Sequence, residues 1–236
     1  MKVIGREEEH IIGGKKIRSA ILGLNDGLIS TFTLLVGIAA ATLESTGSNT
    51  IVILTGIAAM VSGAISMGLG EYLSSKAEYN YIKNEIRREK AEIQLFPEEE
   101  KEEVRDLCKK MGLQGTLLDG CVDAITSNEN NWLNFLLKSE LGLEEPENPI
   151  LGAILTFISF IIGALIPQIA YFLNLGYISL ILSTFLSFSS LFIVGALKTK
   201  ITGEKKIIAA LEMLIIGVIA FAASYSIGLL LERLII

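Results

Sequence analysis

Four glutamates in the middle of this 236-residue chain are spaced as two matching pairs. Glu89 and Glu92 are three residues apart, as are Glu100 and Glu103, and residues at this spacing share one face of a helix. If the chain folds back antiparallel at Phe96, Glu92 meets Glu100 and Glu89 meets Glu103. Taken alone, a glutamate-rich hairpin is usually a solvated face. Converging carboxylates repel unless cations join them, so the paired spacing favours a metal site.

One carboxylate interrupts the first long apolar stretch, Ser19–Leu43. Asp26 lies about seven residues into it, roughly 10 Å deep at 1.5 Å per residue. A carboxylate in a membrane span costs several kcal/mol unless it faces a polar cavity, a partner or an ion. Gly23 and Gly27 allow a close approach to it. We predict a functional role for Asp26, the alternative being a structural aspartate that caps a broken helix or pairs with a cation.

A methionine is the second candidate ligand within the apolar part of the chain. Met67 lies in the stretch Ile51–Gly70, which also has a ladder of small residues at spacing four: Ala58, Ser62, Ser66 and Gly70. Such a ladder lets helices pack closely, and methionine alone is more often a packing residue. If Met67 shares the depth of Asp26, the mixed hard and soft pair suits a first-row transition metal.

Other reactive side chains have weaker assignments. Glu71 ends the second apolar stretch and Glu212 lies about six residues into the last one, where each either carries protons, lines a pathway or marks the interface. Cys108 and Cys121 are too few for a disulfide framework and are expected to be free thiols. His10 is solitary and receives no role.

The elements that position these residues follow from composition. Hydrophobic residues make up 51% of the chain and charged residues 19%, with a mean hydropathy of +0.54. Residues 148–197 contain no charged side chain, which is enough for about two bilayer crossings. A pI near 5.0 gives no support for nucleic-acid binding. The acidic N-terminus predicts no cleavable signal peptide. The chain is therefore expected to be an integral membrane protein.

Five apolar stretches predict an all-α protein with five transmembrane helices and a cytoplasmic helical domain between the second and third. The spans are Ser19–Leu43, Ile51–Gly70, Asn148–Ala170, a fourth that ends near Leu197, and Ile207–Leu231. The predicted divisions are an N-terminal segment 1–18, spans at 19–70, an acidic metal-binding domain at 71–147 and spans at 148–236. Within the acidic domain we expect the second span to continue to about Leu95, and a new helix to start at Pro97.

The distribution of Lys and Arg predicts the orientation. Segment 71–147 contains 18 of the 26 acidic residues and 10 of the 20 basic ones. With five spans, the N-terminus, this domain and the loop 198–206 share one side and hold 19 of the 20 basic residues, leaving Arg233 on the other. Basic residues concentrate on the cytoplasmic side. The N-terminus and the acidic domain are therefore predicted to be cytoplasmic, and the C-terminus outside or lumenal.

Three motifs resemble the vacuolar iron transporter family over nearly the whole chain. They are residues 19–30 (SAILGLNDGLIS), 63–74 (GAISMGLGEYLS) and 138–144 (KSELGLE). The resemblance implies a transporter rather than an enzyme: a homodimer in the lipid bilayer of a cell membrane or vacuolar-type membrane. It would export Fe²⁺, and often Mn²⁺, from the cytosol in exchange for protons, with no permanently bound cofactor. The family's pathway residues fall on Asp26 and Met67, and its cytoplasmic metal-binding glutamates fall on Glu89, Glu92, Glu100, Glu103 and Glu140.

The chain departs from the family pattern at two positions. Leu136 stands where iron-transporting relatives have a methionine, four residues before Glu140, so a soft ligand is missing. Ala59 stands where some relatives have a glutamate, so one candidate carrier of protons or metal is missing. A rival reading is a membrane-anchored iron-oxidising or iron-storing carboxylate protein, although the chain has no Glu-x-x-His pair. A metal sensor is a third reading, which leaves Asp26 unexplained.

Overall fold

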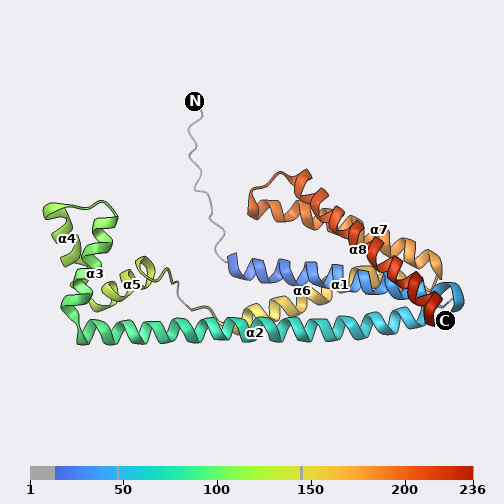
Figure 1. Cartoon of the computed structure of the whole chain (residues 1–236), viewed down its shortest axis with the longest axis horizontal. Helices are drawn as coiled ribbons and strands as arrows, with labels where there is room; N and C mark the ends of the chain where they lie inside the picture. The colour runs from blue at the N-terminus through green and yellow to red at the C-terminus, as the bar shows by residue number, and fades with distance from the viewer. Residues whose placement is uncertain (1–13, 47, 144–145, 236) are drawn as a thin grey trace, which may run out of the picture. The chain divides into compact units, whose positions relative to one another are not determined.

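The computed structural model describes residues 14–46, 48–143 and 146–235, and all regular structure within them is helical. His10 lies outside the described residues. The eight helices, shown in Figure 1, are α1 (Gly14–Thr46), α2 (Thr50–Leu95), α3 (Pro97–Lys110), α4 (Gly115–Thr126), α5 (Glu129–Ser139), α6 (Pro149–Phe172), α7 (Tyr177–Thr202) and α8 (Lys206–Ile235). They form two compact units: a helical unit, Leu73–Pro149, and a transmembrane unit made of the chain before and after it.

Five of these helices are long and apolar enough to cross a membrane: α1, α2, α6, α7 and α8. Large apolar side chains such as Leu54, Phe185 and Ile215 are exposed on the unit, as expected of faces that contact lipid. The prediction of an all-α protein with five spans is therefore confirmed.

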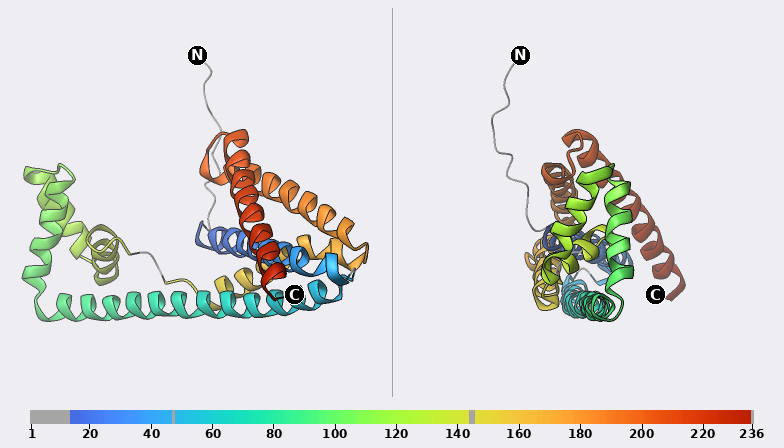
Figure 2. Two further views of the ribbon diagram at one scale, coloured as in Figure 1. Left: turned by 45° about the vertical axis from the view of Figure 1, so that its right-hand side comes forward. Right: turned by 90° about the vertical axis from the view of Figure 1, so that its left-hand side faces the viewer.

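Helix α1 forms much of the core of the transmembrane unit and packs against α7 and α8 (Figures 1 and 2). Phe32 is fully buried, and its ring centroid lies 5.7 Å from that of Phe188 and 6.1 Å from that of Phe221. On another side, Gly23 and Gly27 of α1 lie directly against the backbone of α6, where an added Cβ would clash with carbonyl oxygens. These glycines let two spans touch, as small residues do in membrane proteins.

In the helical unit, α3, α4 and α5 enclose an apolar core against the end of α2. Its fully buried members include Val104, Cys108, Val122 and Leu136. Local sequence signals start and stop these helices. Pro97 occupies the first turn of α3. The side-chain oxygen of Asn128 accepts hydrogen bonds from the backbone at the start of α5, at 2.9 and 3.2 Å.

Candidate metal sites

Five glutamates from three helices meet in the helical unit. Glu89 and Glu92 lie on α2, Glu100 and Glu103 on α3, and Glu140 directly follows α5. Glu89 and Glu100 are only 5% and 7% exposed. Glu100 shares the buried face of α3 with Val104 and Cys108, so the apolar stripe that packs α3 against the core also turns this carboxyl inward. We call these five residues the glutamate cluster.

Two pairs of carboxyl groups face each other within the cluster, Glu100 with Glu89 and Glu140 with Glu103. An ionised carboxylate only accepts hydrogen bonds, so two such groups repel unless a proton or a cation lies between them.

The predicted fold-back at Phe96 pairs Glu92 with Glu100 and Glu89 with Glu103, and the charges of both pairs do influence each other, but the helices do not run back along each other. Phe96 is the one residue between α2 and α3, with φ −132° and ψ 52°. Such a short corner turns α3 away from the end of α2 and does not fold it back along α2, as Figure 1 shows. Glu100 therefore faces Glu89, while Glu103 faces Glu140, directly after α5.

Burial and mutual repulsion change the acidity of the cluster. Burial raises the pKa of Glu89 to about 7, and the charges of Glu100 and Glu140 add to this effect. Burial also raises the pKa of Glu100 to about 7, with further contributions from Glu103 and Glu92. The pKa of Glu140 is raised by burial and then by Glu103. Glu89 and Glu100 therefore exchange protons near neutral pH, well above the ordinary range of a carboxyl group.

Two oxygens of the cluster are buried without any hydrogen-bond partner, Glu89 Oε1 and Glu100 Oε2. An unpaired buried acceptor is unfavourable unless a cation or a donor reaches it. In the part of the chain that the structure describes, no three carboxylate, thiol or imidazole groups are drawn together tightly enough to enclose an ion. Metal binding by the cluster therefore requires the carboxylates to close in around the ion.

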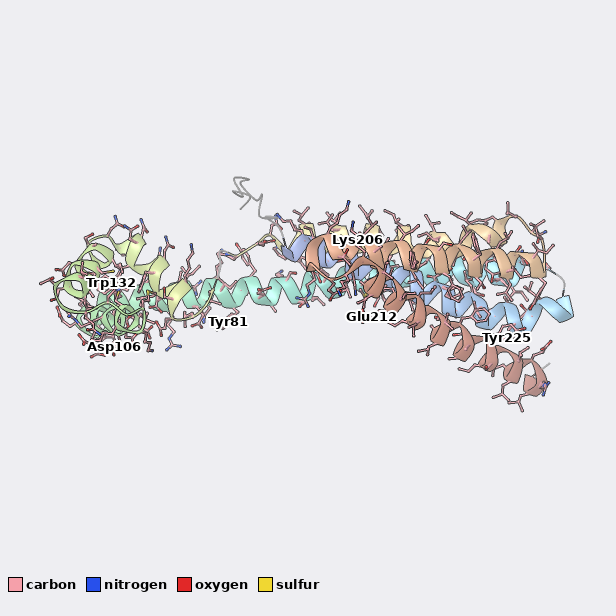
Figure 3. All side chains as sticks on the ribbon, turned by 90° about the horizontal axis from the view of Figure 1, so that it is seen from above. Tyr81, Asp106, Trp132, Lys206, Glu212 and Tyr225 are labelled. Carbon is pink, nitrogen blue, oxygen red and sulfur yellow. The ribbon has the colours of Figure 1, made fainter. Side chains whose placement is uncertain are left out.

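The opposite face of α3 has carboxylates in an ordinary surface setting. Glu98, Glu102 and Asp106 are exposed, as the sequence predicts. Asp106 lies 2.9 Å from Lys109 Nζ and is at the outer edge of the helical unit in Figure 3. These groups provide a matched control for Glu89 and Glu100, since they are carboxylates on neighbouring positions without the burial.

The transmembrane candidates Asp26 and Met67 lie at one level of their unit. Gly27, next to Asp26, contacts the backbone of Phe160, and the ring of Phe160 lies against Gly63, one turn before Met67. Met67 packs in the same small cluster as Phe160. Gly27, which follows Asp26, and Met67 thus contact the same aromatic residue of α6.

Two further donors at this level were not predicted. The side-chain oxygen of Asn25 is buried and has no hydrogen-bond partner, although it directly precedes Asp26. Met60 packs beside Met67, seven residues earlier on the same face of α2. The seven-residue spacing is visible in the sequence, but a neutral amide or a second methionine in an apolar span does not stand out as a charge does.

Glu71 and Glu212 differ in their surroundings. Glu71 is half-buried and accepts a hydrogen bond of 2.7 Å from the hydroxyl of Ser19, which joins α2 to α1. Glu212, labelled on α8 in Figure 3, is exposed and lies 3.6 Å from Lys198 Nζ. Glu212 is thus an exposed, ion-paired group, whereas Glu71 is part of the packing between two spans.

The two departures from the resemblance also have defined surroundings. Leu136 is fully buried in the core of the helical unit, and its carbonyl accepts the backbone N–H of Glu140 at 2.9 Å. An apolar side chain without a sulfur atom thus lies one helical turn before Glu140. Ala59 is half-buried on α2. Cys108 and Cys121 are free, as predicted.

Acidification is expected to stabilise the metal-free protein between pH 8 and pH 5.5. Glu89 and Glu100 have a folded pKa of about 7 against an ordinary value of 4.5, so the folded chain binds more protons in this window and gains stability as pH falls. Hydrogen bonds from lysine side chains lower the pKa values of Asp106 and Asp123. These two groups therefore reduce the stability of the folded protein only when the pH falls below about 3.8. Thermal unfolding of chelator-treated protein should show a midpoint several degrees higher at pH 5.5.

The Glu89→Gln/Glu100→Gln double variant is the control for this pH dependence. It should lack most of the increase, because the groups that take up the protons are gone. An increase of equal size in the variant would mean that the protons bind elsewhere.

Comparison with known proteins gives a consistent set of relatives. The VIT family matches residues 17–229. Vacuolar iron transporter 1 of Oryza sativa subsp. japonica is 34% identical over 221 residues, which cover 92% of this chain and 86% of the relative. The vacuolar iron transporter of Centaurea cyanus is 35% identical over 223 residues, 93% and 89% of the two chains. That of Plasmodium falciparum (isolate 3D7) is 32% identical over 238 residues, 96% and 86%. The matches take in both units and every candidate site.

Proposed function

The chain belongs to the VIT family, and from this premise we propose that it carries Fe²⁺, and also Mn²⁺, out of the cytosol in exchange for protons. It is a membrane transporter of iron and not an enzyme. The metal is its cargo, and no permanently bound cofactor is needed. The glutamate cluster collects the ion, and Asp26 with Met67 passes it through the membrane.

The buried carboxyl groups of Glu89 and Glu100 are the observation that carries this proposal. Each has an oxygen that is buried without a hydrogen-bond partner, and burial raises the pKa of each to about 7. A divalent cation would displace the protons that these groups bind and satisfy both oxygens. Metal and protons therefore compete for the same atoms at a pH near 7, which makes the cluster responsive under cytosolic conditions.

The same competition accounts for coupling at Asp26. A carboxylate in a membrane span is unfavourable when it is charged and alone, so it is stable either with a proton or with a cation. Asp26 releases its proton when the metal arrives and takes up another when the metal leaves. Met67 adds a thioether, and the neighbouring oxygen of Asn25 is free to contact the ion.

The presence of leucine at position 136 supports transport of more than one metal. Without a sulfur ligand beside Glu140, the donors of the cluster are all carboxylate oxygens. Oxygen donors suit Mn²⁺ as well as Fe²⁺, whereas sulfur favours softer ions. The cluster should therefore accept both metals, and the thioether of Met67 would provide most of the preference for iron.

The orientation predicted from the Lys and Arg distribution sets the direction of transport. Cysteines placed at Thr50 and Glu99, which are exposed, can be tested in a background in which Cys108 and Cys121 are alanine. A membrane-impermeant maleimide should label Thr50→Cys in intact cells and leave Glu99→Cys unlabelled until the cells are opened. The reverse pattern would make the protein an importer.

A homodimer is supported by the small-residue ladder of α2. Ala58, Ser62, Ser66 and Gly70 are all exposed in the single chain, and a Cβ added at Gly70 would meet no atom within 4 Å. A face of this kind allows close contact with a helix of a second copy. The ladder lies one position from Ala59 and Met67, so this contact would border the candidate pathway.

Ser62→Leu is expected to shift the protein from dimer to monomer, because a large side chain holds the two helices apart. Ser226→Leu makes the same change on the exposed side of α8 and should leave the dimer intact. Light scattering with the detergent contribution subtracted measures the mass of each. A monomeric wild-type protein would disprove the homodimer.

Metal uptake into empty proteoliposomes separates a transporter from an iron-oxidising or iron-storing protein. A transporter accumulates metal inside the vesicle in proportion to the gradient, whereas the other two classes bind a fixed amount. Saturation at a few ions per chain would favour the rival reading.

A further inference from the structure

A second set of polar side chains is buried inside the transmembrane unit, away from Asp26. Ser179, Ser183 and Ser187 repeat every four residues along one face of α7, and all three are 0% exposed. Gln168 and Tyr171 lie three residues apart on α6 and are also 0% exposed. These residues, together with the fully buried Asn49 at the start of α2, are here called the polar seam.

Hydrogen bonds connect the members of the polar seam across three helices. Asn49 Nδ2 donates to Ser179 Oγ at 2.7 Å and to the carbonyl of Tyr171 at 3.2 Å. Ser183 Oγ donates to the carbonyl of Pro167 at 2.8 Å, one turn before Tyr171. The seam thus extends over about one turn of α6 and about two turns of α7.

Three atoms of the seam are nevertheless left without a hydrogen-bond partner: Asn49 Oδ1, Gln168 Oε1 and Ser187 Oγ. The hydroxyl of Tyr171 has that of Ser183 as its neighbour. The two amide groups cannot pair their oxygens by turning over, because their N–H₂ groups already donate to the seam and, for Gln168, to the carbonyl of Ile53 at 3.2 Å. Unpaired polar groups inside a membrane are strongly unfavourable, and the bilayer core supplies no water. Buried water is the ordinary partner of such groups.

The seam occupies the half of the unit opposite to the N-terminal end of α1. Ser179 lies in the first turn of α7, next to the α6–α7 connection, and Ser187 is eight residues further, about 12 Å along the helix. Because the ring of Phe32 packs on that of Phe188, Ser187 lies near the level of Phe32. This level is six residues beyond Asp26 on α1, or about 9 Å in depth.

We propose that the polar seam holds a chain of internal waters that returns protons from the non-cytoplasmic side towards the level of Asp26. The inference rests on the proposed exchange of metal for protons and assigns the outer part of the proton route. Hydroxyl groups both donate and accept, so Tyr171 and the three serines can each receive a proton on the oxygen while their own proton passes to the next water. The fixed amide oxygens of Asn49 and Gln168 only accept and would anchor the waters.

Hydroxyl-radical footprinting of the wild-type protein in lipid nanodiscs tests for the water directly. X-ray pulses generate the radicals from water at the site, so a buried ring beside internal water is oxidised and a dry ring is not. Tyr171 and Phe32 are equally buried at 0% exposure, and Phe32 provides the dry comparison. Tyr171 should be modified several-fold faster than Phe32. Equal protection of both rings would overturn the proposal.

Proton flux tests the route. The Tyr171→Phe/Ser187→Ala variant should lose most of the proton movement per metal ion, while metal still stabilises its glutamate cluster as in the wild type. Ser189→Ala, on the side of α7 that lines an open apolar groove with Phe185 and Phe192, should keep the wild-type ratio. The single variant Tyr171→Phe, which removes only one oxygen, replaces the double variant in this experiment if the double variant folds poorly.

The outcomes separate this inference from the proposed function. If the wild type exchanges metal for protons and the seam variants keep the same number of protons per metal ion, the protons take another route. The polar seam is then not their path. Metal transport without any proton movement in the wild type rejects the exchange itself and the seam's role with it. An equal loss of proton flux in Ser189→Ala also overturns the proposal.

Discussion

The Asp26→Asn variant is expected to bind metal in its helical unit and to transport none of it. Asparagine is nearly isosteric with aspartate but cannot be ionised, so it neither balances the charge of a divalent cation nor carries a proton. The fold should be retained, since a neutral amide is less unfavourable than a charged group in a membrane span. Metal flux into proteoliposomes should fall to the level of empty vesicles, while metal still raises the unfolding temperature.

Glu212→Gln is the matched control for Asp26→Asn. It also removes one carboxylate from a membrane-spanning helix, but Glu212 is exposed and paired with Lys198 at 3.6 Å. Transport should stay close to the wild-type rate. Wild-type flux in Asp26→Asn would show that the pathway does not use this aspartate.

Replacement of Glu89 and Glu100 by glutamine is expected to remove most of the stabilisation that metal gives to the protein. The pair supplies the buried, unpaired oxygens, and a neutral amide is a weak ligand. A ligand that binds only the folded state contributes about 2.7 kcal/mol at one hundred times its dissociation constant, and this contribution should largely vanish. The metal-free variant should be more stable than the wild type at pH 8, because the repulsion between the carboxylates is relieved.

The Glu98→Gln/Glu102→Gln variant makes the same chemical change on the exposed face of α3. It should keep the metal-induced shift, and its transport should match the wild type. Transport in the Glu89/Glu100 variant should slow without ceasing, because Asp26 and Met67 remain. Equal effects of the two double variants would mean that the region is a diffuse acidic surface and contains no site.

The fold follows from the sequence because hydrophobic length is a strong signal. Spans of 20 or more apolar residues have few alternatives in a bilayer. Pro97, Gly112 and Asn128 mark helix ends through local backbone chemistry, and the structure places the ends of α3, α4 and α5 close to them. The continuation of α2 to Leu95 was predictable because no glycine or proline interrupts residues 71–95.

The arrangement of the carboxylates was less predictable. The spacing of Glu89, Glu92, Glu100 and Glu103 shows which residues share a helix face, but the partner of each depends on the one-residue corner at Phe96. Glu140 joins the cluster through the packing of α5, which no local pattern encodes. Its assignment came from the family resemblance alone.

Neutral polar residues in the spans were the largest omission. Asn25, Gln168 and Tyr171 carry no charge, and their importance appears only when their burial and hydrogen bonds are known. A sequence shows that a polar residue lies in a span, but not whether its atoms find partners. For this reason the polar seam became visible only in the structure.

The most direct test of the account is to record metal uptake and internal pH in the same proteoliposomes, with wild type and Asp26→Asn side by side. Vesicles that contain a metal-sensitive dye and a pH dye are given Fe²⁺ on the side of the glutamate cluster. The account predicts that metal enters while protons leave, in a fixed ratio, and that both movements cease in Asp26→Asn. Metal entry with no change of internal pH, or equal movement in the variant, would contradict it.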